Sequence, residues 1–310
     1  MLLITGSCGF IGSNLVHYLH EQGRDDVVCL DNLSIGSSLG RIAGIPGVRF
    51  HREDLTWAAG IEKIFMLYDI TEVIHLAAAS HVDRSISGDH PFWMTNVVGT
   101  ANLLRACREH KVKKVIVQIT DEFYGEKPPG TAALEGDMPM PTSPYPCSKV
   151  GQYYVGRTYF QTYDLPVLFT FPVNCYGPRQ HEEKLIPKFS TRLLQGKKVP
   201  LMASSHFERD WLPVIDMCRA LELLLDKGEP GQDYNVGADN HHTNLQLTHK
   251  LLELTGRDEN FIEVVPDRAA HDSRYAVNYD KLITLGYKPS QAFDEYLALT
   301  VDWYRKELKL

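Results

Sequence analysis

The chain has 310 residues, of which 44% are hydrophobic and 23% charged, and its formal net charge is -7 at pH 7. This length allows one large domain or two modest ones, and the composition is that of an ordinary globular protein. The negative charge argues against a nucleic-acid partner, and the absence of an apolar run of about 18 residues argues against a membrane-spanning helix.

The N-terminal sequence MLLITGSCGF predicts a first strand and not a signal peptide, because glycines interrupt its apolar run and no Lys or Arg precedes it. The six cysteines show no CxxC or metal-ligand spacing. We therefore expect free thiols in a reducing cytosol, no metal site and a cytoplasmic protein.

Short β-branched runs alternate with helical periodicity through the first half of the chain. This alternation predicts a parallel sheet covered by helices on both faces. The predicted strands are 2–5, 27–31, 48–54, 72–78, 113–120 and 166–173, and the predicted helices between them are 11–22, 92–109 and 148–164. Helices are also predicted at 184–195, 213–227, 244–255 and 292–307.

The fold class is therefore α/β, a Rossmann-type doubly wound parallel sheet with a smaller C-terminal substrate-binding domain. After about residue 174 loops lengthen and prolines interrupt the pattern, so loops and helices are expected over the carboxyl edge of the sheet. We expect an NAD-binding domain from residues 1–173 plus about 211–237. A second domain, which binds the substrate, is expected from residues 174–210 plus 238–310.

A glycine loop follows the first predicted strand and opens the first predicted helix. Gly6, Gly9 and Gly12 allow a tight turn and a close approach of backbone N–H groups to a pyrophosphate. Asp31 lies 19 positions after Gly12, at the end of the second strand, where it suits a ribose diol. Asn32, Leu33 and Ser34 follow without an Arg, which favours NAD over NADP. The alternative is a glycine turn with a capping aspartate.

Two further strand ends are predicted to face the dinucleotide. Asp54 and Leu55 follow the third strand and suit contact with adenine. Leu76, Ala77 and Ala78 end the fourth strand, and the small alanines let a dinucleotide lie on the backbone. An ordinary strand end and simple core packing are the alternatives.

A tyrosine and a lysine lie one helical turn apart in the sequence Tyr145-Pro-Cys-Ser-Lys149. An ammonium beside the phenol is expected to lower the pKa of Tyr145 and make it a base for a sugar hydroxyl, while Lys149 can also hold the nicotinamide ribose. This pattern alone is common on helix surfaces, but here it follows the fifth strand of a glycine-loop domain.

Thr120, Asp121 and Glu122 stand at the end of that fifth strand. The Thr120 hydroxyl can share a substrate oxygen with Tyr145. Adjacent carboxylates in different environments can separate their pKa values into an acid and a base. A solvated acidic turn is the alternative, and the presence of Tyr145 and Lys149 argues against it.

These motifs resemble the extended short-chain dehydrogenase/reductases, and within them the dTDP-glucose 4,6-dehydratases. The matching segments run in order along nearly the whole chain, and TDE and HDxRYA are the most specific of them. The segments are TGSCGFIG (5–12), LAAASHVDRSI (76–86), TDEFYG (120–125), YPCSK (145–149), NCYGPRQHEEKLIP (174–187), RDWL (209–212), YNVG (234–237) and DRAAHDSRYA (267–276).

The resemblance implies a lyase of deoxysugar biosynthesis that converts a nucleotide-diphosphate sugar to a 4-keto-6-deoxy sugar and water. Tyr145 would take the O4 proton while the C4 hydride goes to NAD. Glu122 would then remove the C5 proton, Asp121 would protonate the leaving C6 hydroxyl, and the hydride would return to C6. The resemblance also implies a homodimer.

The resemblance also assigns contacts by position. NAD would be held by Phe10, Ile11, Asp31, Asn32, Leu33, Ser34, Asp54, Leu55, Leu76, Ala77, Ala78, Ser80 and Thr95, with Tyr145 and Lys149. The sugar or its phosphates would meet Ser80, Thr120 and Asn174. The nucleotide would meet Lys184, Leu185, Pro200, Leu201, Met202, Arg209, Asn235, Asp267, Arg268 and His271.

The sequence departs from the family pattern at the two ends of this site. Cys175 replaces an Asn expected near the nicotinamide, and Met202, Ala203 and Pro213 are also unusual. The substrate is therefore dTDP-glucose or UDP-glucose, with another hexose open. A 4-epimerase or decarboxylase on the same scaffold, and a non-catalytic sugar-nucleotide-binding protein, remain alternatives. Asp121 and Glu122 argue against the epimerase and the decarboxylase, because neither needs an acid–base pair at C5 and C6. The five intact reactive side chains argue against a non-catalytic protein.

Overall fold

The structure is a computed structural model that describes residues 1–267, 274–290 and 292–310. Its largest element is a parallel sheet of seven strands in the order β10-β6-β5-β4-β1-β2-β3. This order confirms the predicted Rossmann-type fold. The strands are β1 (Leu2–Thr5), β2 (Val27–Asp31), β3 (Arg49–Arg52), β4 (Glu72–His75), β5 (Lys114–Gln118), β6 (Val167–Pro172) and β10 (Asp233–Val236).

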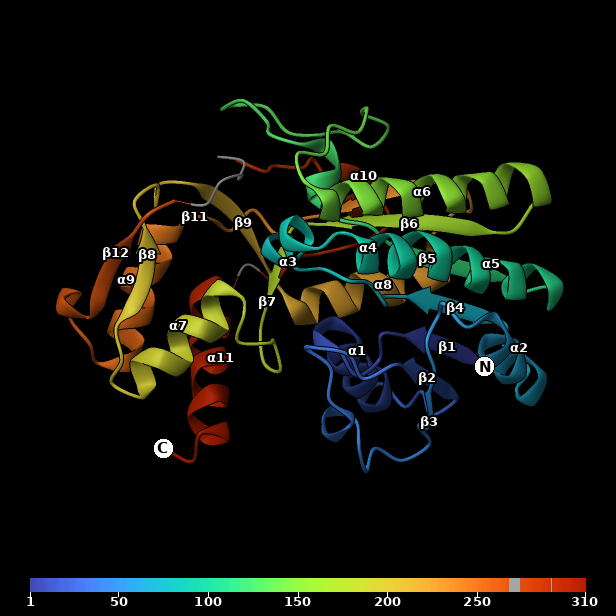
Figure 1. Ribbon diagram of the computed structural model, residues 1–310, viewed down its shortest axis with the longest axis horizontal. Coiled ribbons are helices and arrows are strands. Elements are labelled where there is room, and N and C mark those ends of the chain that lie inside the picture. Colours follow the sequence, from blue (N-terminus) through green and yellow to red (C-terminus); the bar gives the residue numbers. More distant parts are fainter. Residues whose placement is uncertain (268–273, 291) are drawn as a thin grey trace.

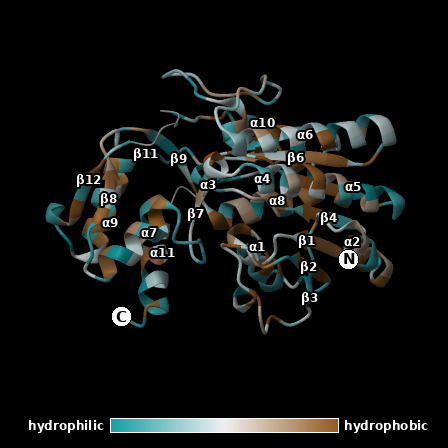
Figure 2. Cartoon of the chain, in the orientation of Figure 1, coloured by the Kyte–Doolittle hydropathy of each residue, from teal (hydrophilic) through white to brown (hydrophobic). Residues whose placement is uncertain are grey.

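Helices cover both faces of the sheet because its strands are apolar on both sides. Leu168 on β6 contacts the end of α8 at Gly228, while the next residue, Phe169, faces Gly156 of α6. Helix α1 packs against α8, and α5 lies beside α6 (Figure 1). Strand β6 is brown along most of its length in Figure 2. The covering helices are α1 (Phe10–Glu21), α2 (Ala58–Leu67), α5 (Thr100–Glu109), α6 (Pro144–Tyr163) and α8 (Val214–Lys227).

The helix predicted at 92–109 is not uniform. It begins with α4 (His90–Phe92), continues as a π-helical segment (Trp93–Gly99) and becomes regular only in α5. Such wide turns are common at functional sites. The segment ahead of it contains the short helix α3 (Val82–Ser87).

A second group of elements surrounds a separate hydrophobic cluster that includes Tyr176, Phe189 and Leu297. Helices and loops were predicted here, but two small sheets are also present: β11-β9-β7 and β12-β8. The elements are β7 (Asn174–Tyr176), β8 (Val199–Met202), β9 (Glu208–Pro213), β11 (His241–Thr243), β12 (Ile262–Val265), α7 (Leu185–Leu194), α9 (Asn244–Thr255) and α11 (Phe293–Glu307). Helix α10 (Asp280–Thr284) packs instead against β10 of the large sheet.

The chain crosses between the two groups more than once. Residues after β9 return to the large sheet, where β10 pairs with β6, and then leave it again for β11. The two groups lie side by side along the long axis of the molecule (Figure 1). Among the described residues, no helix combines the length and apolar character needed to cross a bilayer.

Candidate active site

A cavity of about 810 Å³ opens at the carboxyl ends of the central strands, where ligands bind in open α/β sheets. The residues predicted to hold the cofactor line its wall, with the exception of Leu33. Those on the wall are Gly6, Gly9, Phe10, Ile11, Gly12, Asp31, Asn32, Ser34, Asp54, Leu55, Leu76, Ala77, Ala78, Ser80, Thr95, Tyr145, Lys149 and Cys175.

The glycine loop has the geometry that the sequence predicted. Gly6 has φ +69°, in the left-handed region, and an added Cβ there would lie 2.7 Å from the backbone of Ala77. A Cβ on Gly12 would lie 2.1 Å from the carbonyl oxygen of Gly6. Only glycine permits this turn, which places the N-terminus of α1 against the cavity.

Asp31 lies at the end of β2 and is buried beside the glycine loop. Its carboxylate accepts hydrogen bonds from the backbone N–H groups of Cys8 (2.9 Å) and Leu33 (2.8 Å). Leu33 therefore shapes the site through its backbone, with a left-handed φ of 58°, although its side chain is not on the cavity wall. Asn32 donates to the carboxylate of Asp54 at 2.9 Å, which joins the ends of two neighbouring strands.

The five residues predicted to be catalytic meet on one side of the cavity. Thr120 lies two residues after β5 and caps a tight helical turn that begins with Asp121 and Glu122. The Thr120 hydroxyl and the Asp121 carboxylate accept from the Glu122 N–H. Tyr145 and Lys149 come from the first two turns of α6, which Pro144 opens. Lys149 is buried, and its ammonium donates to the Gln118 carbonyl at 2.6 Å.

Burial shifts the pKa values of Asp121 and Lys149 away from their ordinary values. Burial and then the charge of Glu122 raise the pKa of Asp121 to about 7, against an opposing effect of Arg209. Burial alone lowers the pKa of Lys149 to about 7. Asp121 can therefore hold a proton near neutral pH, as a general acid must.

The predicted lowering of the Tyr145 pKa by Lys149 is wrong for this structure. Burial and the charge of Glu122 raise the pKa of Tyr145, and a hydrogen bond with Thr120 opposes them. The ammonium of Lys149 is directed at the Gln118 carbonyl, so it does not offset the loss of solvent around the phenol.

The residues predicted to hold the sugar and nucleotide fall into two groups. Ser80, Thr120, Asn174 and Lys184 line the cavity, and the Lys184 ammonium donates to the Ser80 carbonyl at 3.3 Å. The others lie beyond its wall. These are Leu185 at the start of α7, Pro200, Leu201 and Met202 on β8, Arg209 on β9 and Asp267.

Arg209 nevertheless acts on Asp121 from outside the cavity wall, whereas Asp267 contacts the loop after β8. The Arg209 guanidinium stacks over the Tyr275 ring, 4.6 Å from its centroid, and lowers the pKa of Asp121. Asp267 accepts from the backbone N–H (2.8 Å) and hydroxyl (2.6 Å) of Ser204. Arg268 and His271 lie outside the described residues.

The structure does not bring Asn235 into the cavity. Its side chain is fully buried at β10, accepts from the Tyr124 hydroxyl at 2.9 Å and donates to the carbonyls of Ala133 and Asn278. Contact with a nucleotide would require these bonds to break, and the side chain instead fixes a loop to the sheet.

Some cavity residues were not found from the sequence. Gln118, Val173, Arg84 and Glu183 line the wall, and an ion pair joins Arg84 to Glu183. The sequence offered no spacing that relates Arg84 on α3 to Glu183 ahead of α7. His81, which had no predicted role, caps α3 by accepting from the Arg84 N–H.

Asp210, Asp239 and His241 form a metal-like cluster on and beside β9. The buried carboxylate of Asp210 accepts from the backbone N–H groups of Ala238, Asp239 and Asn240. This cluster is therefore the anchor of the turn after β10.

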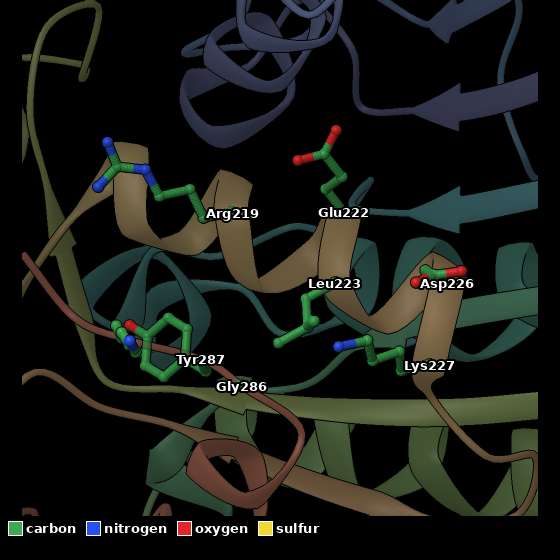
Figure 3. A pocket seen from close by; sticks show the side chains of 8 residues that line it. Arg219, Glu222, Leu223, Asp226, Lys227, Gly286 and Tyr287 are labelled. Atoms are coloured by element: carbon green, nitrogen blue, oxygen red, sulfur yellow. The ribbon is translucent and has the colours of Figure 1, made fainter.

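A second hollow of about 640 Å³ lies between α8 and residues 286–288 (Figure 3). Two of its charged groups are engaged locally: Arg219 pairs with Asp216, and Lys227 donates to the Leu285 carbonyl. It contains none of the predicted catalytic residues.

The family model described as GDP-mannose 4,6-dehydratase matches residues 3–300. The chain belongs to this family. It is 41% identical over 306 residues to the low-salt glycan biosynthesis protein Agl12 of Haloferax volcanii, which covers 98% of both chains. It is 40% identical to a dTDP-glucose 4,6-dehydratase of an Actinoplanes species, over 98% of this chain and 97% of the relative.

Solved structures of family members have the same fold. The dTDP-glucose 4,6-dehydratase DesIV of Streptomyces venezuelae, with NAD bound, is 38% identical and superposes with a TM-score of 0.95 over 99% of this chain and 98% of its own. The UDP-glucose 4-epimerase of Thermus thermophilus, also with NAD, is 34% identical with a TM-score of 0.92 over 98% of each chain.

Proposed function

We propose that this protein is an NAD-dependent nucleotide-sugar 4,6-dehydratase that converts dTDP-glucose or UDP-glucose to the 4-keto-6-deoxy sugar nucleotide and water. The observation that carries this proposal is the Asp121–Glu122 pair, which lies beside Tyr145 on the wall of the glycine-loop cavity. Dehydration needs a base and an acid on adjacent carbons, and the raised pKa of Asp121 separates the two roles.

The cavity fits a dinucleotide. Its wall runs from Asp31 and Asp54 past the glycine loop to Tyr145 and Lys149. Because Gly6 and Gly12 have no Cβ, the loop can form a tight turn that directs backbone N–H groups at the cavity. When bound, NAD accepts a hydride from C4 of the sugar and returns one to C6.

The side chains divide the proton transfers. Tyr145 takes the proton of O4 in its ionised form, which the hydrogen bond with Thr120 favours against the effect of burial. Thr120 also holds O4, and Lys149 orients the nicotinamide ribose. Glu122 removes the C5 proton, which the C4 ketone acidifies, and returns it to C5 when the hydride is added at C6. Asp121, protonated near neutral pH, gives its proton to the leaving C6 hydroxyl. The burial of Thr120, Asp121, Tyr145 and Lys149 limits the access of bulk water to these protons, while Glu122 is half-buried.

A 4-epimerase is the second candidate, since the UDP-glucose 4-epimerase of Thermus thermophilus has the same fold. Epimerisation needs Tyr145, Lys149 and NAD, and no group acting at C5 or C6. A buried Asp121 with a raised pKa has no task in that reaction, which favours the dehydratase.

Product analysis tests the proposal. The purified protein is incubated separately with dTDP-glucose and UDP-glucose, and mass spectrometry and NMR are expected to show loss of one water and a C4 ketone. Conversion to the C4 epimer without loss of water would identify an epimerase instead.

The variants Glu122→Gln and Asp121→Asn test the roles of the carboxyl groups. Both are expected to keep the fold and bound NAD and to lose at least about a hundredfold in turnover, the usual effect of removing a general acid or base. Wild-type turnover in either variant would refute its assigned role.

The proposal also covers the oligomeric state, the division into domains and the cellular location. The exposed side chains of Val98, Tyr154 and Tyr163, on the π-helical segment and α6, support a homodimer through this face. Residues 1–173 plus 211–237 would hold NAD and the remainder the nucleotide sugar. The buried free cysteines accord with a cytoplasmic location. Sedimentation of the purified protein tests the dimer, and a monomer would refute it.

A further inference from the structure

A fully buried histidine, His75, lies behind the cavity and outside its wall. It ends β4, the strand whose continuation Leu76–Ala78 faces the predicted dinucleotide. Its Nδ1 lies 2.7 Å from the hydroxyl of Thr5 on β1, and its Nε2 lies 2.8 Å from the hydroxyl of Thr100 on α5. The ring thus joins three elements of the cofactor-binding half.

The hydrogen bonds around the ring determine its tautomer. Thr100 donates its single proton to the Asn96 carbonyl at 2.7 Å, so the Thr100 oxygen must accept from Nε2–H. Burial, then the charge of Lys149, lowers the pKa of His75 to about 3, so the ring is neutral and Nδ1 is an acceptor. Thr5 therefore donates to Nδ1, while its oxygen accepts from the Ala77 N–H at 3.3 Å.

The chain of hydrogen bonds has one direction throughout. It runs from the Ala77 N–H through Thr5, His75 and Thr100 to Asn96. In the reverse direction, the Thr5 hydroxyl would no longer donate to His75, and the Thr100 hydroxyl would no longer donate to the Asn96 carbonyl. A neutral imidazole is suited to this place because it offers one acceptor and one donor on opposite sides.

The chain continues to the catalytic helix. The side chain of Asn96, in the π-helical segment, accepts from the Ala79 N–H at 2.9 Å and donates to the Ala79 carbonyl and to Ser148. Ser148 donates to the carbonyl of Tyr145 at 2.6 Å. The cavity wall at Ala77 and Ala79 is therefore linked to the backbone of the proposed base through buried groups.

We propose that His75 is a positioning residue, whose fixed Nε2–H tautomer holds the cofactor-facing wall at Ala77–Ala79 in register with the Tyr145 helix. It touches neither cofactor nor substrate, and it acts by keeping the distance between the bound NAD and Tyr145 constant. The effect of His75 on hydride transfer rests on the proposed dehydratase function, whereas the tautomer of the ring follows from its hydrogen bonds and burial.

The first test is the tautomer itself. Imidazole ¹⁵N shifts of histidine-labelled protein are expected to show one histidine with protonated Nε2 and bare Nδ1 at every pH at which the protein is folded. In Thr100→Val, which keeps the side-chain shape and lies off the cavity wall, this signal is expected to shift. A protonated Nδ1, or a ring that titrates near neutral pH, would overturn the proposal.

The second test separates positioning from mere stability. Thr100→Val and His75→Leu are expected to slow the hydride step about tenfold in single-turnover measurements with little change in KM, while bound NAD stays stoichiometric. His75→Gln, which carries an acceptor and a donor on one amide, is expected to recover most of the loss. Wild-type hydride transfer in folded Thr100→Val and His75→Leu would overturn the proposal, as would equal losses in His75→Leu and His75→Gln.

The two tests fail differently. If the wild-type protein dehydrates no sugar nucleotide although the predicted tautomer is present, the proposed function is wrong and the hydrogen-bond chain remains. If dehydration is observed but the tautomer is reversed, the positioning role of His75 is wrong and the function remains.

Discussion

At the scale of single residues, the site depends on groups held in an unfavourable protonation state. Asp121 is buried next to another carboxyl, and this environment raises its pKa to about 7 from 3.8. The same burial that equips Asp121 to donate a proton destabilises its ionised form in the folded state.

This gives a pH prediction with a definite sign. Because the folded pKa of Asp121 is raised, the free energy of unfolding falls as pH rises from about 3.8 through about 7. Asp121→Asn is therefore expected to be more stable than wild type at alkaline pH, on the order of 2 kcal/mol, although inactive. In the wild type, kcat is expected to fall as pH rises above about 7, because the acid loses its proton.

Urea unfolding at several pH values and a kcat–pH profile check both statements. A stability difference between wild type and Asp121→Asn that does not change with pH would contradict the raised pKa.

At the scale of elements, the glycine loop is a turn that can form only because its glycines have no Cβ. Gly12→Ala is expected to prevent the loop from closing, because its Cβ would lie 2.1 Å from the Gly6 carbonyl oxygen. We expect bound NAD to fall at least about tenfold and the free energy of unfolding to fall by about 1–3 kcal/mol.

Gly23→Ala is the matched control. Gly23 has a left-handed φ of +81°, unlike Gly12 in α1, but no atom of another segment lies within 4 Å of the added Cβ. It should cost about 1 kcal/mol and leave the NAD content unchanged. Equal NAD loss in the two variants, measured on the purified proteins, would show that strain elsewhere and not the loop clash governs binding.

Elements with strong local signals were predictable, and those without them were not. The glycine loop, six of the seven strands of the large sheet and the Tyr145–Lys149 turn follow from spacing and periodicity, but β10 was not predicted. Helix α2 was missed because it starts after Trp57 with no side-chain cap and no acidic first turn. Strands β8 and β9 were missed because each contains a proline, Pro200 in β8 and Pro213 in β9.

Site features that depend on tertiary burial were equally hidden from the sequence. The raised pKa of Tyr145 and the enclosure of Asn235 depend on groups brought together from distant segments. The pairing of Arg84 with Glu183 is of the same kind.

At the scale of the whole molecule, residues 177–184 form a strap that crosses from the second group of elements to the first. Asn14 of α1 donates to the Pro178 carbonyl at 3.0 Å, and Arg84 of α3 pairs with Glu183. Tyr304 of α11 anchors the other side by donating to the Gln180 carbonyl. The strap thus connects both groups at the mouth of the cavity.

Breaking the Arg84–Glu183 pair is expected to loosen this strap. Arg84→Glu and Glu183→Arg should each speed NAD dissociation about two- to fivefold, the effect of a partly exposed ion pair, and the charge-swapped double variant should restore the slow rate. Stopped-flow displacement of bound NADH measures the dissociation rate. Arg108→Glu, which breaks a surface pair with Glu109, is the control and should change nothing.

The return of the chain to β10 has a consequence for how this protein can be divided. Strand β10 covers the edge of β6, and α8 fills the face beside α1, yet both follow the elements β7 to β9 in the sequence. A polypeptide truncated after residue 173 would therefore end with an unprotected apolar edge and a bare sheet face, and would aggregate. Exchange of substrate specificity by recombination needs at least two crossover points, since no single cut yields a self-sufficient half.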